Sequence, residues 1–145
     1  MTLTAFVATA TTCHVVPGSE EVTEDGKLRV RDRTFTDLVE SSEPYIAGTN
    51  RPTLNLDFDP ARGDGVVRGR FALSPSSPGG RWEGELSGRF ESGLVRAVGL
   101  ACGTGPLAGS VLHVEFRQIP AHPGTPPCPE PKAFFEMAGT ILRPD

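Results

Sequence analysis

Residues 81–90 read RWEGELSGRF, a regular alternation of two kinds of side chain. Trp82, Leu86 and Phe90 fall on one face of an extended chain, because successive side chains of a β-strand point to opposite sides. The other face carries only charged or polar residues. This period of two predicts a strand with one buried face and one solvated face.

Seven other runs have the same β character and are separated by clusters of Gly, Pro, Asp and Ser, which are typical of turns. No segment has sustained helical periodicity. The 17 glycines and 14 prolines also argue against a helix bundle, since both residues weaken helix interiors. The eight predicted strands are Thr2–Thr12, Lys27–Glu40, Ile46–Phe58, Val66–Ser74, Arg81–Phe90, Leu94–Cys102, Ser110–Ile119 and Lys132–Leu142.

Length and charge limit the classes of function. A chain of 145 residues is predicted to form one domain, residues 1–145. Its 14 Lys and Arg against 18 Asp and Glu give a formal net charge of -4, which argues against nucleic acid and anionic membranes as partners. No apolar run approaches the roughly 18 residues that span a bilayer, so no membrane span is expected.

Eight strands joined mostly by short turns predict an all-β fold, a single eight-stranded antiparallel up-and-down β-barrel. Closure removes the exposed edges of an open sheet. A β-sandwich is the alternative, because a period of two does not distinguish the two folds. The two longest loops, Pro17–Gly26 and the proline-rich Pro120–Pro131, fall at the same end, which is therefore the predicted mouth.

Aromatic residues gather toward that end of the predicted apolar face. Phe58, Phe90 and Phe116 lie nearest to it, together with either Phe134 or Phe135. They line a ligand cavity or form the hydrophobic plug of a packed barrel. The predicted ligand-binding residues are Phe58, Trp82, Phe90, Phe116 and Phe134.

Three polar residues share the apolar register and are the predicted catalytic groups. Asp32 continues the face of Val30, Arg96 shares the face of Val98, and Gln118 follows the apolar face of its strand. Polar groups inside an apolar barrel are costly unless they pair or serve a ligand, and burial raises the pKa of a carboxyl. The alternative is a β-bulge or register slip that turns Asp32 and Arg96 outward. No metal-binding or cofactor motif is present, and no cofactor is expected.

The strand order also places the cysteines. In a closed barrel the end of the first strand lies beside the start of the eighth, so Cys13 and Cys128 are predicted neighbours, with Cys102 at the opposite end. A Cys13–Cys128 disulfide would close nearly the whole chain into one loop and tether Pro120–Pro131 over the mouth. A cytoplasmic location is favoured, and export is expected instead if this bond forms.

The C-terminal half contains a group of turn and strand motifs. Residues 102–109, CGTGPLAG, lead into a strand that ends at Arg117-Gln118, and KAFF at residues 132–135 opens the last strand. Over roughly Gly65–Leu142 this arrangement resembles the allene oxide cyclase barrel-like superfamily, whose turn is shared by dirigent proteins. The resemblance implies an eight-stranded antiparallel barrel with a cavity for a hydrophobic small molecule. The plant enzymes' N-terminal catalytic segment and its Glu have no counterpart here.

Three functions follow as hypotheses. The first, which the resemblance implies, is a cyclase or isomerase that holds an apolar substrate in the barrel, in natural-product biosynthesis. The second is a non-catalytic, lipocalin-like barrel that binds a hydrophobic small molecule. The third is a filled barrel whose outer face is an interaction or homo-oligomer surface. A cavity of a few hundred Å³ is expected of the first two.

Overall fold

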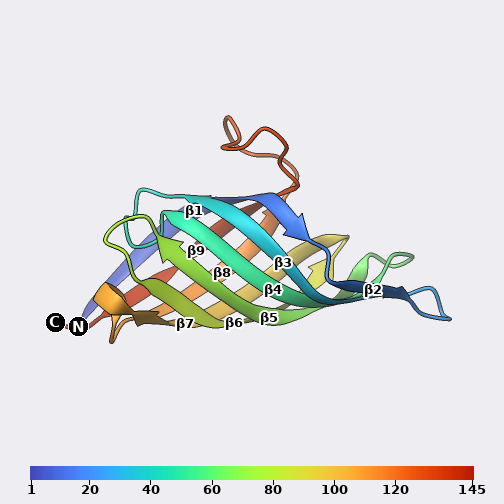
Figure 1. Ribbon diagram of the computed structural model, residues 1–145, viewed down its shortest axis with the longest axis horizontal. Coiled ribbons are helices and arrows are strands. Elements are labelled where there is room, and N and C mark those ends of the chain that lie inside the picture. Colours follow the sequence, from blue (N-terminus) through green and yellow to red (C-terminus); the bar gives the residue numbers. More distant parts are fainter.

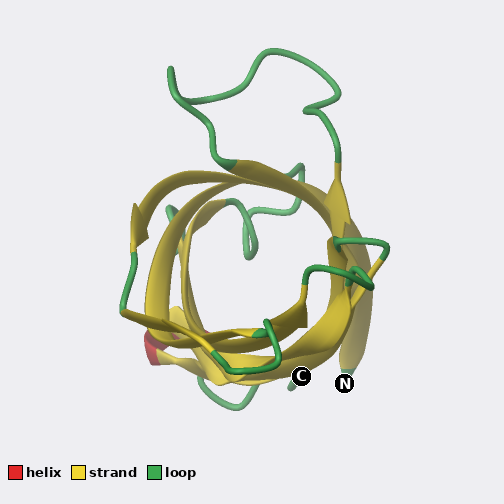
Figure 2. Ribbon diagram, turned by 90° about the vertical axis from the view of Figure 1, so that its right-hand side faces the viewer, coloured by secondary structure: helices red, strands yellow, loops and turns green.

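The strands form one antiparallel sheet that closes on itself (Figures 1 and 2). In the computed structural model, which describes residues 1–145, strands β3 to β9 pair in chain order, β9 pairs with β1, and β1 pairs with β3. The predicted eight-stranded all-β barrel is therefore confirmed, and the sandwich is wrong. The strands are β1 (Thr2–Val16), β2 (Ser19–Val22), β3 (Leu28–Glu40), β4 (Gly48–Asp59), β5 (Asp64–Pro75), β6 (Arg81–Glu91), β7 (Leu94–Thr104), β8 (Val111–Ile119) and β9 (Ala133–Arg143).

A ninth strand lies in the segment predicted to be a polar loop, Pro17–Gly26. Here β2 pairs antiparallel with the first residues of β3 and forms a hairpin that projects past the barrel (Figure 1). Arg33 holds its start by donating from Nε to the Pro17 carbonyl oxygen at 3.1 Å. The loop prediction failed because β2 is entirely exposed and lacks the apolar alternation of a half-buried strand. The single helical turn is η1 (Gly105–Leu107), and no helix is long and apolar enough to cross a membrane.

The barrel interior is filled with side chains over most of its length. Trp82, Leu112 and Ile141 are 0% exposed, so no space of the size of a water molecule adjoins them. Trp82 lies at the end that carries the chain termini, where its Nε1 donates to the Tyr45 carbonyl oxygen at 2.9 Å. The interior therefore has no room for a small molecule beside these residues.

Strand β7 presents its small residues to the interior. Ala97 and Ala101 are buried, whereas Val98 and Leu100 are 46% and 59% exposed. Larger inward side chains do not fit on this strand, because even a Cβ on Gly99 would lie 2.8 Å from the ring of Phe71. The expectation that the larger apolar residues of this strand mark its inner face is wrong.

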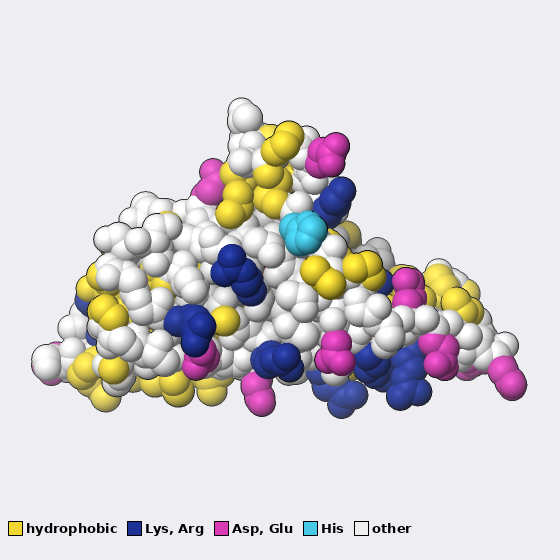
Figure 3. All heavy atoms as spheres, viewed as in Figure 1, with side chains coloured by type: hydrophobic (Ala, Val, Ile, Leu, Met, Phe, Trp, Pro, Cys, Tyr) yellow, Lys and Arg dark blue, Asp and Glu magenta, His cyan; other side chains and the backbone are white.

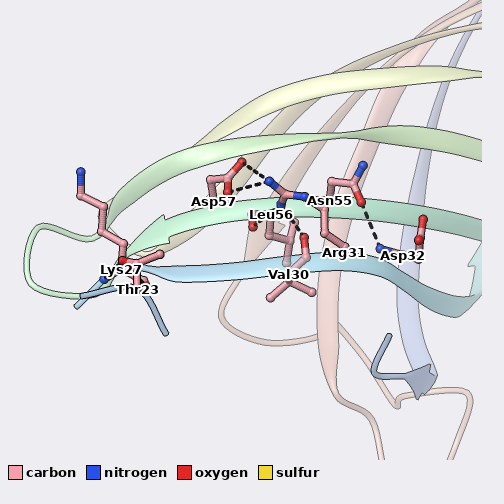
Figure 4. A network of polar contacts seen from close by, with 8 residues as sticks. All are labelled: Thr23, Lys27, Val30, Arg31, Asp32, Asn55, Leu56 and Asp57. Atoms are coloured by element: carbon pink, nitrogen blue, oxygen red, sulfur yellow. Dashed lines mark hydrogen bonds and ion pairs between the residues drawn. The ribbon is translucent and has the colours of Figure 1, made fainter. Parts of the chain in front are cut away.

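A β-bulge interrupts β3. Val30 pairs with Leu56 and Arg33 with Leu54, so Arg31 and Asp32 together stand opposite one residue, Asn55. Asp32 has φ +54°, a left-handed conformation that Asp tolerates better than most residues, and its N–H donates to Asn55 Oδ1 at 3.0 Å (Figure 4). The extra residue exchanges the inner and outer faces of the strand beyond it.

A second bulge places Cys13, which stands unpaired between Thr12 and His14 in the β1–β3 ladder. Cys13 forms a disulfide with Cys128, and the two Cα atoms are 6.2 Å apart. The predicted proximity of these cysteines is confirmed. Cys102 is free and exposed.

The proline-rich loop lies outside the barrel and not over its mouth, as Figure 2 shows. His122 Nε2 lies 2.8 Å from Glu40 Oε1, and the His122 ring packs edge-on against Phe134. Glu40 and Phe134 belong to the outer faces of β3 and β9. The expectation that the disulfide tethers this loop over the mouth is therefore wrong, because Cys13 points away from the interior at its bulge.

Removal of the disulfide should destabilise the fold without changing its topology. The bond joins residues 115 apart, which in the chain-entropy model is worth about 4 to 5 kcal/mol. The double variant Cys13→Ser/Cys128→Ser should lose that much unfolding free energy in urea, and dithiothreitol should lower the stability of the natural sequence but not that of the double variant. Cys102→Ser is the matched control. Equal stability of the double variant and the natural sequence would contradict the assignment.

Candidate functional site

Four apolar side chains and one amide lie on the inner faces of the strands at the predicted mouth. Phe58, Phe90 and Val95 are joined in register through Gly65 across β4, β5, β6 and β7, and Phe135 of β9 stands opposite Gln118 of β8. All are half-buried, in contrast to the closed interior beneath them. These five side chains, Phe58, Phe90, Val95, Gln118 and Phe135, are called the mouth ring.

Two contacts fix the shape of the mouth ring. Gly65 has no side chain between Phe58 and Phe90, and the two rings meet with centroids 4.7 Å apart. On the neighbouring strands β7 and β8, Gln118 Oε1 accepts a hydrogen bond from the Val95 N–H at 3.0 Å. The amide thus extends the β7–β8 ladder past its last backbone pair, Arg96 and Arg117. Gln118 faces the mouth as expected, and its visible role is structural.

The other predicted aromatic residues lie elsewhere. Trp82 is fully buried at the far end, and Phe116 is 8% exposed in the middle of the core, edge-on to Phe71. Phe134 is on the outer wall against His122, so its placement among the inward residues is wrong. The buried Met137 and Ile141 set the inward register of β9, which selects Phe135.

The prediction that Asp32 and Arg96 face the interior is wrong. The bulge turns Asp32 to the exposed side, where Arg31 and Asp57 also form an ion pair at 3.1 Å (Figure 4). Arg96 lies on the outer face of β7 with its side chain 61% exposed, near Glu91. Neither residue can exchange a proton with a molecule inside the barrel.

A different carboxyl occupies the interior. Asp37 follows the bulge on β3, is 5% exposed, and accepts a hydrogen bond from Thr12 Oγ1 at 2.7 Å. On its other side it pairs in register with Asn50 of β4, which is 1% exposed and whose Oδ1 has no hydrogen-bond partner. Uninterrupted alternation from Leu28 places residue 37 outside, so only knowledge of the bulge could have identified it.

Burial raises the pKa of Asp37 from 3.8 to about 6, because the charged form loses its hydration. Hydrogen bonds from Thr12 and Asn50 lower the pKa but do not outweigh this effect. Asp37 is thus a carboxyl that titrates close to neutral pH, a property common among proton-transferring groups. Elsewhere, no three His, Cys, Asp or Glu side chains lie close enough together to hold a metal ion.

Comparison with protein-family models, with curated proteins and with solved structures gives no match to this chain.

Replacement of Asp37 by Asn should remove a pH-dependent loss of stability. With a pKa near 6 in the folded state and 3.8 when unfolded, Asp37 favours folding most below about pH 4, and this contribution is lost as pH rises through 6. The difference between the two pKa values corresponds to about 3 kcal/mol of unfolding free energy. Asp37→Asn should therefore gain stability relative to the natural sequence between pH 4 and pH 7, measured by urea unfolding.

The exposed Asp64 provides the matched control, since Asp64→Asn also removes one carboxylate but none from the interior. If the stability difference between Asp37→Asn and the natural sequence is the same at pH 4 and pH 7, the assignment of a raised pKa is wrong.

Proposed function

We propose that this protein binds an apolar small molecule in the mouth of its barrel. The observation that carries the proposal is the mouth ring, in which Phe58, Phe90, Val95 and Phe135 remain half-exposed at the inner rim of a barrel that is closed below. Exposed apolar surface inside a concave opening is typical of small-molecule sites. The ligand class agrees with the one implied by the resemblance to allene oxide cyclase-like barrels.

The filled interior limits the size and depth of the ligand. Val67, Val114 and Leu112 are 0% exposed, so the ligand would lie against the mouth ring and would not enter the core. Packing between the apolar rim and an apolar molecule supplies the binding free energy, at about 25 cal/mol per Å² of surface removed from water. A rim of this kind suits a compact ring system or the end of an acyl chain.

Asp37 supports a second candidate, an isomerase or cyclase. It is the buried carboxyl of the interior, and a pKa near 6 suits a group that both gives and takes a proton. In this candidate the mouth ring restrains the substrate and Asp37 transfers a proton. Binding ranks first, because Asp37 is 5% exposed and a substrate would have to displace side chains to reach it.

A charge placed in the mouth should abolish binding of an apolar probe. Val95→Glu should weaken the binding of N-phenyl-1-naphthylamine at least about tenfold, because ligand contact would bury the carboxylate. The probe's fluorescence enhancement measures binding. Val66→Glu is the matched control, since Val66 is 47% exposed on the outer face of β5.

A second variant distinguishes loss of the binding site from loss of folding. Val95→Phe fills the opening with an apolar side chain and should also reduce probe binding while the circular dichroism of the barrel is retained. Equal binding by Val95→Phe and the natural sequence would contradict the proposal, as would equal loss in Val66→Glu. If Asp37→Asn keeps probe binding but loses isomerase or cyclase activity, the second candidate is favoured.

A further inference from the structure

The outer wall of the barrel is unusually apolar on β7, β8 and β9. Leu100, Val98 and Val111 are 59%, 46% and 37% exposed, and Ala138 of β9 is exposed beside them. Figure 3 shows hydrophobic side chains along the lower left edge, where Figure 1 places β7. The outer face of an antiparallel barrel in water is normally polar. A cluster of exposed apolar residues therefore indicates an interaction surface.

Charged residues cross the same wall in an ordered row. Arg96 of β7 is in register with Arg117 of β8, which is in register with Glu136 of β9. The row continues to Arg89 on β6 at one end and, through β1, to Glu40 on β3 at the other. A hollow of about 1220 Å³ follows this row.

The charges of the hollow cancel but are segregated. Most of the arginines lie on the β5, β6 and β7 side, and most of the glutamates lie on the β8, β9 and β3 side. The four arginines that line it are Arg68, Arg89, Arg96 and Arg117, and the four glutamates are Glu40, Glu91, Glu115 and Glu136. A nucleic acid or an anionic membrane requires a basic surface, and this one is neutral overall.

A surface with one basic half and one acidic half is complementary to itself. In a two-fold dimer, residue i of one copy meets residue j of the other, and residue j meets residue i. Arg96 and Glu136 lie one strand to either side of β8. A two-fold axis that runs along β8 therefore brings Arg96 of each copy opposite Glu136 of the other and Val98 opposite Ala138, and it places Arg117 of each copy beside Arg117 and Glu115 of the other.

We propose that the protein forms a two-fold homodimer through the outer wall of β7, β8 and β9, with Arg96 facing Glu136 of the second copy. Both side chains are available, since they are 61% and 51% exposed. Glu136 already pairs with Arg117 of its own chain, so the second copy adds a cation to an existing pair. The apolar residues Val98 and Ala138 flank the row and supply the area removed from water. The mouth ring lies on the inside of the barrel and takes no part.

Reciprocal charge reversal tests this arrangement. Arg96→Glu sets two glutamates against each other at both contacts, and Glu136→Arg sets two arginines there. Each variant alone should associate about 100-fold more weakly than the natural chain. An equimolar mixture should form a heterodimer, because each reversed residue then meets an opposite charge. Native mass spectrometry with an affinity tag of different mass on each variant separates the species.

Two controls complete the experiment. All proteins carry Cys102→Ser, because Cys102 is exposed on the same wall, in register with Val111, and would otherwise crosslink copies covalently. Arg51→Glu reverses an exposed charge on β4, the barrel strand that does not line the hollow, and should leave the dimer intact. A Cys102→Ser chain that stays monomeric at about 100 µM, where a dimer with a Kd in the micromolar range is largely associated, overturns the proposal. So does a mixture in which no heterodimer forms.

Discussion

The pairing of β1 with β3 is the contact on which the rest of the molecule depends. Without it the remaining strands would form an open sheet with two long edges, and its twist would leave the inner side chains in water. With it, Trp82, Leu112 and Ile141 become inaccessible, although none of them belongs to β1 or β3. The seam itself contains the bulge at Cys13 and the buried hydrogen bond between Thr12 and Asp37.

The disulfide stabilises this seam from the outside. Cys13 belongs to the strand that closes the barrel, and Cys128 belongs to the loop that feeds β9, the other neighbour of β1. The backbone continues the connection, since the Lys132 N–H donates to the Thr12 carbonyl oxygen at 2.8 Å. Disulfides persist chiefly in oxidising compartments, where this bond would hold the seam closed.

The eight barrel strands, their order and the neighbouring cysteines could be predicted from the sequence, because they depend only on turn residues and on alternation of direction, whereas the exposed strand β2 was missed. Inward or outward placement could not be predicted equally well. A single extra residue at the bulge moved Asp32 outside and Asp37 inside, and no local pattern marks that position. On β7 the large residues lie outside because the interior space is taken by side chains from other strands, such as Phe71 against Gly99. Both failures concern contacts between distant segments.

The bulge on β3 also determines which kinds of genetic change the chain tolerates. A substitution at Arg31 removes a half-exposed ion pair, at 3.1 Å from Asp57, and the hydrogen bonds of its guanidinium to the Val30 and Leu56 carbonyl oxygens, but leaves the strand in place. Deletion of one residue at the bulge restores strict alternation and keeps Val39 in the core, because Val30 and Val39 then stand an even number of residues apart. Deletion of Leu38 has the opposite effect, because it removes no bulge and turns Val39 toward solvent. In this strand, the damage done by a deletion therefore depends on whether it falls at the bulge.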